Sequence, residues 1–446
     1  MNNSQKLVLL QLKIYIMNIK LILIGFLLMT AELCMAQICG CTDSLASNYN
    51  DSATINDGSC VYETTVIDTN LVGTLDAVIE GSSSLFFWNN GFWTYNDHND
   101  NCLYHIDSAH ATILETLCIN GLSNYDTEEI SQDSLYLYFG EIGNNSGNRH
   151  NLHILRIRKE SLVNHIYEMD TIWFSYEDQT DYTPQTQATD FDCEAFVVTR
   201  DSIFLFTKQW VSTQTTLYSL PKTPGHHIAR RGETYNVNGL ITGATYLPNY
   251  QLVVLCGYDY NSDNLLTAMH PFIILLYDFQ DDKFFSGNKR RLDLDLSMRA
   301  QVEAIATNNA LDYYITSEHY AANVIFFNID VPAQLQRLDL REYLLPYLNK
   351  FGVSGNPVAT PDPLERESGF RIYPNPAYEQ LYLDYPQEYL GAEYEILNLN
   401  GQKVAEGILK DNSISLNNNN LSSGKYILFL RKNGEMKTFT FIKKEK

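Results

Sequence analysis

The sequence predicts an all-β protein: a β-propeller, with six blades favoured and five possible, followed by a small C-terminal β-sandwich. Two observations carry this prediction. One unit recurs through the middle of the chain: an acidic or small residue, and about a dozen residues later an aromatic-rich strand with a polar tip. The last part of the chain is a separate set of short alternating strands. Recurrence of a strand-built unit at this length is the sequence signature of a propeller.

The clearest copies of the unit begin at Glu128, Glu194 and Glu303, a weaker one at Gly243 and a degenerate one at Glu80. The spacings between these markers are 48, 66, 49 and 60 residues. Roughly four strands per unit make one propeller blade. Residues 64–350 therefore hold the propeller, and six blades are favoured if segments 66–79 and 320–345 close the ring.

Composition and charge agree with this class and exclude others. The 446 residues include 30 Tyr and 21 Phe, which suit strands. The formal charge of −22 argues against a nucleic-acid partner or an anionic membrane surface, since both require a clustered cationic patch. The sequence also lacks a Gly-x-Ser-x-Gly elbow, a phosphate-binding loop and a His-Glu-x-x-His pair. The common nucleophile, nucleotide and zinc-protease chemistries therefore have no motif here.

The N-terminus predicts export. Lys20 precedes the apolar run 21–29, and small residues follow near Ala36, which is the pattern of a signal peptide over residues 1–36. Met17 begins a leader of more usual length, so translation can start there. Cleavage would leave Gln37 as the first residue. No later apolar run is long enough to span a bilayer, so we expect no transmembrane segment in the mature chain.

Residues 37–63 form a small module rich in Cys, Asp and Asn. Its Cys-Thr-Asp start at Cys41 and Asp-Gly-Ser-Cys end at Cys60 resemble a short repeat of exported Bacteroidetes proteins. That repeat usually has a further cysteine where this chain has Ser47, which leaves the pairing open; Cys41 with Cys60 is the first choice. The Asn and Asp side chains either wrap a calcium ion or form turns.

The repeated carboxylates are the candidate functional residues. The innermost strand of each blade lines the central channel, so Glu128, Glu194 and Glu303 are expected to converge on it. Converging carboxylates repel one another unless a cation or a shared proton offsets them, which predicts calcium or another hard metal. Such a site would resemble the calcium-dependent lactonase and esterase-like propellers. In the alternative, each Glu caps backbone amides of a neighbouring blade.

Segments 93–97, 140–149 and 205–221 resemble a group of exported bacterial propeller proteins. The likeness spans most of residues 75–320, and it implies a fold without implying an activity. Trp88, Trp93, Trp173 and Trp210 either stack on a ligand or belong to blade cores, the more usual place for strand aromatics.

A Pro-rich linker is predicted over residues 351–368, and a sorting domain over 369–446. The segment 370–377 (FRIYPNPA), the Asn-Gly turn at Asn400 and the strands around Tyr426 and Phe441 resemble the type A C-terminal sorting domain of the type IX secretion system. The resemblance implies passage across the outer membrane by that machinery, and a product that is released or held at the cell surface.

These observations lead to one expected function and two alternatives. We expect a secreted or surface-attached propeller that binds an unknown surface ligand or partner without catalysis. The first alternative is a calcium-dependent hydrolase that uses the channel carboxylates. The second is an adhesin whose small N-terminal module is stiffened by calcium.

Overall fold

The computed structural model describes residues 37–260, 269–296, 300–324, 327–354, 371–373, 377–384, 389–398, 402–410, 413–416, 421–432 and 435–444. It divides into two units, Met1–Gly355 and Asn356–Lys446, and each is described by itself. The signal peptide expected at 1–36 and the linker residues 355–368 lie outside the described residues.

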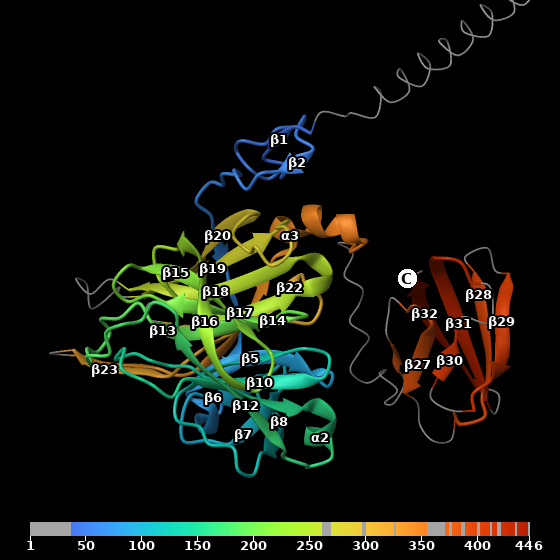
Figure 1. The fold of residues 1–446 in the computed structure, drawn as a ribbon, viewed down its shortest axis with the longest axis horizontal. Helices are drawn as coiled ribbons and strands as arrows, with labels where there is room; N and C mark the ends of the chain where they lie inside the picture. Colours follow the sequence, from blue (N-terminus) through green and yellow to red (C-terminus); the bar gives the residue numbers. More distant parts are fainter. Residues whose placement is uncertain are drawn as a thin grey trace, which may run out of the picture. The chain divides into compact units, whose positions relative to one another are not determined.

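The first unit is a ring of antiparallel blades (Figure 1). Blade 1 consists of β5 (Ser82–Trp88), β6 (Gly91–Asn96), β7 (Cys102–Ile106) and β8 (Ile113–Cys118). Blade 2 consists of β9 (Thr127–Gln132), β10 (Tyr136–Glu141), β11 (His153–Arg158) and β12 (Met169–Tyr176). Blade 3 consists of β13 (Asp192–Val198), β14 (Ser202–Lys208), β15 (Gln214–Pro221) and β16 (Gly225–Asn236).

Blade 4 consists of β17 (Leu240–Leu247), β18 (Leu252–Tyr260), β19 (Met269–Tyr277) and β20 (Asn288–Asp295). Blade 5 combines β21 (Val302–Thr307), β22 (Asp312–Ser317) and β25 (Gln334–Asp339) with β4 (Asn70–Thr74) from the N-terminal side. The hairpin of β23 (Tyr320–Val324) and β24 (Phe327–Val331) is inserted between β22 and β25. Short helices at α2 (Lys159–Val163), α3 (Arg341–Leu348), η1 (Ala77–Ile79), η2 (Pro248–Tyr250) and η3 (Asn349–Phe351) connect or cover the blades.

The order of the innermost strands closes the ring. β5 packs beside β9, β9 beside β13, β13 beside β17, β17 beside β21, and β21 beside β5. Every residue of β13 is buried, as expected for a strand covered on both faces by other blades. The described residues thus form a five-bladed propeller.

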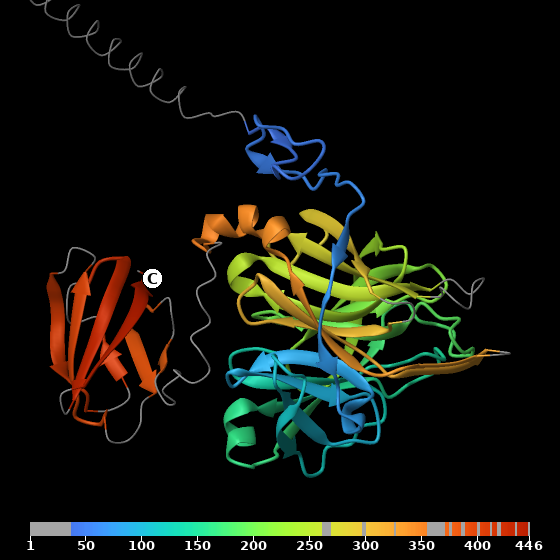
Figure 2. The same ribbon diagram turned by 180° about the vertical axis from the view of Figure 1, so that it is seen from behind.

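The favoured count of six blades was therefore wrong, and the five-blade alternative is correct. Segments 66–79 and 320–345 do close the ring, but β4 and β25 pair with each other inside one blade. The short β3 (Val66–Asp68) extends blade 4 by pairing parallel with β20. In Figure 2 the blue N-terminal strand runs beside the orange strands of blade 5.

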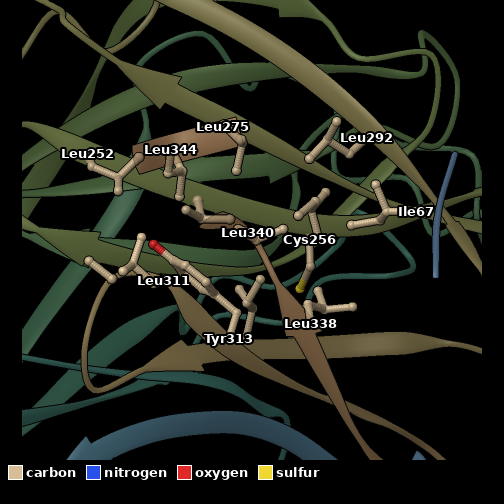
Figure 3. Packing of buried hydrophobic residues seen from close by; sticks show 14 of the residues in the cluster. Ile67, Leu252, Cys256, Leu275, Leu292, Leu311, Tyr313, Leu338, Leu340 and Leu344 are labelled. Atoms are coloured by element: carbon tan, nitrogen blue, oxygen red, sulfur yellow. The ribbon is translucent and has the colours of Figure 1, made fainter. Parts of the chain in front are cut away.

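The core between blades 4 and 5 shows how the ring is held. Leu252, Leu275 and Leu292 of blade 4 face Tyr313 and Leu338 of blade 5 (Figure 3). Ile67 of β3 lies at one end of this cluster, and Leu344 of α3 also belongs to it. Through Ile67, the N-terminal segment is part of the propeller core. Burial of one such side chain contributes about 1.5–3 kcal/mol to stability.

The small N-terminal module is a parallel pair, β1 (Cys39–Gly40) with β2 (Ile55–Asn56), joined by a disulfide between Cys41 and Cys60. Two of its polar side chains form turns: Asn56 Oδ1 accepts from the Gly58 amide at 3.0 Å, and Asp57 Oδ1 from the Ser59 amide at 3.1 Å. Asn56 Nδ2 also donates to Asn288 of blade 4 at 2.9 Å.

The second unit contains two small sheets. One holds β26 (Arg371–Tyr373), β27 (Gln380–Asp384) and β30 (Ser413–Ser415). The other holds β29 (Lys403–Ile408), β28 (Glu393–Asn398), β31 (Gly424–Lys432) and β32 (Glu435–Lys443). Leu381 of the first sheet and Leu428 of the second belong to one buried cluster, which agrees with the predicted sandwich.

Candidate functional site

Each innermost strand of the propeller carries a β-bulge near its start. The register skips one residue in every blade: Ser83, Glu128, Glu194, Thr242 and Glu303. A bulge places two residues opposite one and re-aims a side chain. The repeated markers of the sequence are therefore the bulge residues, or lie within three positions of them.

Two of the five bulges join neighbouring blades. Ser83 Oγ donates to the Thr127 carbonyl of blade 2 at 2.9 Å. Thr242 Oγ1 donates to the Val302 carbonyl of blade 5 at 2.5 Å. Both hydroxyls are buried, so these bulge residues have a structural role.

The three glutamates occupy the remaining bulges and come together at one mouth of the channel. All three are buried, with 8% of Glu128, 4% of Glu194 and 5% of Glu303 exposed. Glu194 lies close enough to both others to affect their ionisation, and it shares a hydrogen bond with Glu303. We call the mouth that they share with Asp126, Asp192, Lys208 and Glu318 the acidic mouth.

Lys208 provides the cation of the acidic mouth. Its Nζ donates to both oxygens of Glu194, each at 2.6 Å, and 4% of its side chain is exposed. Nζ also lies 4.8 Å from the ring centre of Trp210 and 5.3 Å from that of Tyr258. Burial opposes the charge of Lys208, but Glu194, Tyr258, Glu303 and Asp192 together outweigh it, so the pKa of Lys208 is raised. The sequence analysis did not predict Lys208 as a site residue. It lies opposite Asp192 in the β13–β14 register.

Asp192 is fixed in place by three donors. The Asn144 amide donates to its Oδ1 at 2.6 Å, the Cys193 amide to the same oxygen at 3.0 Å, and Trp210 Nε1 to Oδ2 at 2.8 Å. These bonds orient Trp210 as part of the mouth. Trp93, by contrast, is 1% exposed and belongs to the core between blades 1 and 2.

Glu128 differs from the other carboxylates of the mouth. In the described part of the chain, no hydrogen-bond donor contacts either of its oxygens. Gly143 lies directly against it, since a Cβ at that position would come within 2.5 Å of Glu128 Oε1. Burial, with Glu194 and Asp126 nearby, raises the pKa of Glu128 well above its ordinary value. Glu128 is thus a largely buried carboxyl close to other acidic groups.

The neighbouring carboxyls of the mouth also titrate high. Burial raises the pKa of Asp126 to about 6, although Arg149 Nη1, 3.4 Å from its Oδ2, opposes the shift. Burial raises the pKa of Glu303 to about 8, and the nearby Glu318 adds to this shift. Burial also raises the pKa of Glu318 to about 8, and the nearby Asp97 adds to it. The mouth therefore holds protons at neutral pH that a bound cation would displace.

The predicted metal site has no ligand set in this geometry. Among the described residues, no group of three His, Cys, Asp or Glu side chains is placed to hold a metal ion. Both oxygens of Glu194 face Lys208 instead. The capping role considered for the three glutamates is performed by Glu129: its Oε2 accepts from the Ala244 amide of β17 at 3.0 Å. Calcium at Glu128, Glu194 and Glu303 stays a prediction.

Glu129 also separates the two ends of the channel. β9 and β17 are not neighbours in the ring, so this bond crosses the axis below the acidic mouth. Beyond it lies a separate hollow of about 170 Å³, lined by Phe87, Gln132, Tyr246 and Thr307 among others.

Comparison with known protein families finds a match for the second unit. Residues 371–444 match the family described as the secretion system C-terminal sorting domain. The chain carries a type IX secretion sorting domain. This sorting domain directs the protein to the cell surface or the extracellular space, as the sequence predicted. No helix in the described residues has the length and apolar character needed to cross a bilayer.

Several solved structures are similar to this chain at low identity. The glutaminyl cyclase of Myxococcus xanthus is 10% identical over 62% of this chain and 100% of its own, with a TM-score of 0.35. PorZ of Porphyromonas gingivalis, a surface component of the type IX secretion system, is 13% identical over 81% of this chain and 45% of its own, with a TM-score of 0.27.

A gluconolactonase of Xanthomonas campestris is 10% identical over 62% of this chain and 97% of its own, with a TM-score of 0.32. Among proteins with curated descriptions, none matches this sequence significantly. The propeller assignment rests on the strand order of the chain itself.

Proposed function

We propose that this protein is an exported binding module, and that the acidic mouth of its propeller binds a positively charged ligand. The observation that carries the proposal is the gathering of Glu128, Glu194 and Glu303, three largely buried carboxyl groups, beside Lys208. Carboxylates brought together repel one another unless cations offset their charge. A cationic ligand would add to Lys208 in that role.

The charge of the whole protein favours the same class of ligand. The formal charge is −22, and a strong net charge raises the local concentration of ligands of the opposite sign around the protein. Binding is therefore expected to weaken as salt is added, because salt screens this attraction.

Isothermal titration calorimetry of the purified exported protein tests the proposal. The probes are calcium chloride, n-butylammonium chloride and methylguanidinium chloride, each against the unaltered protein, Glu128→Gln and Glu115→Gln. Glu115 is exposed on β8, so its variant is the control for the loss of one negative charge. The proposal requires that at least one probe binds and that Glu128→Gln alone weakens it. Absence of binding by all three probes contradicts it.

One observation favours a second candidate, a hydrolase. Glu303 and Glu318 hold protons at neutral pH, since their pKa values are raised to about 8, and a buried carboxylic acid of that kind is a suitable general acid. Hydrolysis of p-nitrophenyl acetate, with and without calcium, tests it. Turnover that Glu303→Gln abolishes would support the hydrolase, and equal rates in both proteins would reject it.

A further inference from the structure

We propose that the cleft between the N-terminal module and blade 4 is a second binding site, and that it takes a neutral oligosaccharide. The cleft shares no residue with the acidic mouth, so this inference goes beyond the proposed function. Its fixed walls, its size and the polar character of its lining support it.

Hydrogen bonds hold the N-terminal module on blade 4. Thr42 Oγ1 and Asn56 Nδ2 both donate to Asp278 Oδ2, at 3.3 and 3.1 Å. Tyr277, the last residue of β19, donates from its hydroxyl to Asp43 of the module. Because these bonds already fix the two walls of the cleft relative to each other, a ligand that binds between them does not have to order them.

The cleft has the size of a ligand-binding site. Its volume is about 920 Å³, within the range of about 300–1,000 Å³ that ligand pockets occupy, and such pockets are common where two structural modules meet. At about 30 Å³ for each water molecule, the volume equals that of about thirty waters, which suits a chain of sugars better than a single ring. The module wall consists of Thr42 and residues 53–57, and the propeller wall of Gln251, residues 278–281, Ser286 and Lys350.

The lining of the cleft is polar. Among the described lining residues only Ala53, Ile55 and Phe279 are apolar, and Phe279 is 3% exposed because it belongs to a propeller core. The other side chains carry amides, hydroxyls, carboxylates and one ammonium, with Gln280 and Thr54 exposed on opposite walls. Amides and hydroxyls both donate and accept hydrogen bonds. They therefore match the hydroxyls of a sugar, which also do both, and leave little surface for an apolar ligand.

The charges of the cleft favour a neutral ligand. Asp57, Asp278 and Asp281 outnumber the single lysine of the lining, so an anionic ligand would meet net repulsion. Asp278 is already engaged by its two donors from the module and lies 3.8 Å from Lys350 Nζ, and Lys350 would in turn repel a cationic peptide. In the described part of the chain, no group of three acidic, His or Cys side chains is placed to hold a metal ion. A neutral polyhydroxy ligand avoids both repulsions.

Isothermal titration calorimetry with neutral trisaccharides tests the inference. The probes are maltotriose, isomaltotriose, mannotriose and N,N′,N″-triacetylchitotriose, and at least one is expected to bind the exported protein. Gln280→Ala on the propeller wall and Thr54→Val on the module wall should each weaken that binding by about threefold to tenfold, the loss of one hydrogen bond. Gln185→Ala is the matched control and should leave the affinity unchanged, since Gln185 is exposed between β12 and β13, outside the cleft. Unchanged melting temperatures show that the variants are folded.

Tri-L-lysine is the cationic comparison. Tri-L-lysine binding that Asp281→Asn abolishes, with no trisaccharide bound, overturns the inference and identifies the cleft as a site for a cationic peptide. Trisaccharide binding that neither wall variant weakens places the site elsewhere and overturns it, as does the absence of binding by every trisaccharide. Each of these results leaves the proposed function standing, because that function is tested with calcium, butylammonium and methylguanidinium at the acidic mouth.

Discussion

Nζ of Lys208 donates to both carboxylate oxygens of Glu194 at 2.6 Å, in a part of the propeller where neither side chain is more than 5% exposed. The two residues come from adjacent strands of blade 3, β13 and β14. Glu303 of blade 5 shares a hydrogen bond with the same glutamate. The Lys208–Glu194 pair of blade 3 thus affects the ionisation of Glu303 in blade 5.

Removing one member of this pair is predicted to be costly. Lys208→Met leaves Glu194 buried without its cation, and breaking a buried pair from one side typically costs about 3–5 kcal/mol. Chemical denaturation measures the loss in the free energy of unfolding. The double variant Lys208→Met with Glu194→Gln is expected to recover part of it. A single variant within about 0.5 kcal/mol of the unaltered protein would show that the pair is not buried in solution.

Stability is predicted to fall as pH rises between about 4.5 and about 8. Burial raises the pKa values of Glu303 and Glu318 from 4.5 to about 8, so the folded protein binds more protons than the unfolded chain in this window. The stabilising contribution is complete below the unfolded value and is lost as pH passes the folded one. Melting temperatures across the window measure it.

Glu303→Gln is the control for that pH dependence, because glutamine is neutral throughout. Its melting temperature is expected to change less with pH than that of the unaltered protein. Identical slopes in the two proteins would show that Glu303 titrates normally in the folded state.

The disulfide between Cys102 and Cys118 is predicted to stabilise blade 1. It joins β7 to β8 across 16 residues, and closing a loop of that size contributes about 3 kcal/mol in the chain-entropy model. Replacing both cysteines with serine should lower the unfolding free energy of the propeller by roughly that amount. Replacing Cys41 and Cys60, which join only the N-terminal module, should lower it far less. Equal effects of the two double variants would contradict the assignment.

The sequence predicted the architecture well where one residue type marked the repeat. Glu128, Glu194 and Glu303 are all bulge residues. The markers at Glu80 and Gly243 were displaced from Ser83 and Thr242, because those bulges carry a hydroxyl that bonds the next blade. The local sequence pattern could not show that some bulges carry a glutamate and others a hydroxyl that bonds the next blade.

The features that the sequence did not predict depend on long-range pairing. Cys102 and Cys118 appeared as single cysteines because only the β7–β8 register brings them opposite each other. Lys208 appeared as the end of a strand, and its partner Glu194 is set by the bulge opposite it. The blade count failed because β4 joins β25 from the far end of the domain.

Closure of the ring by β4 leads to a last prediction, on truncation. Deleting residues 37–76 removes the strand that pairs with β25, from Asn70 opposite Arg337 to Thr74 opposite Gln334. It also removes Ile67 and Leu75 from the cores on either side of blade 5. A marginally stable domain does not tolerate the loss in stability from two missing core side chains together with an unpaired β25 edge.

That deletion is therefore expected to abolish the cooperative thermal transition and to expose the propeller to proteolysis. The matched control deletes residues 37–61, which removes the disulfide-joined part of the module and keeps β3 and β4. It should retain the transition, since the ring stays closed by the same strands. A cooperative transition in the longer deletion would mean that blades 1 to 4 hold the ring without the outermost strand of blade 5, and that β4 is dispensable.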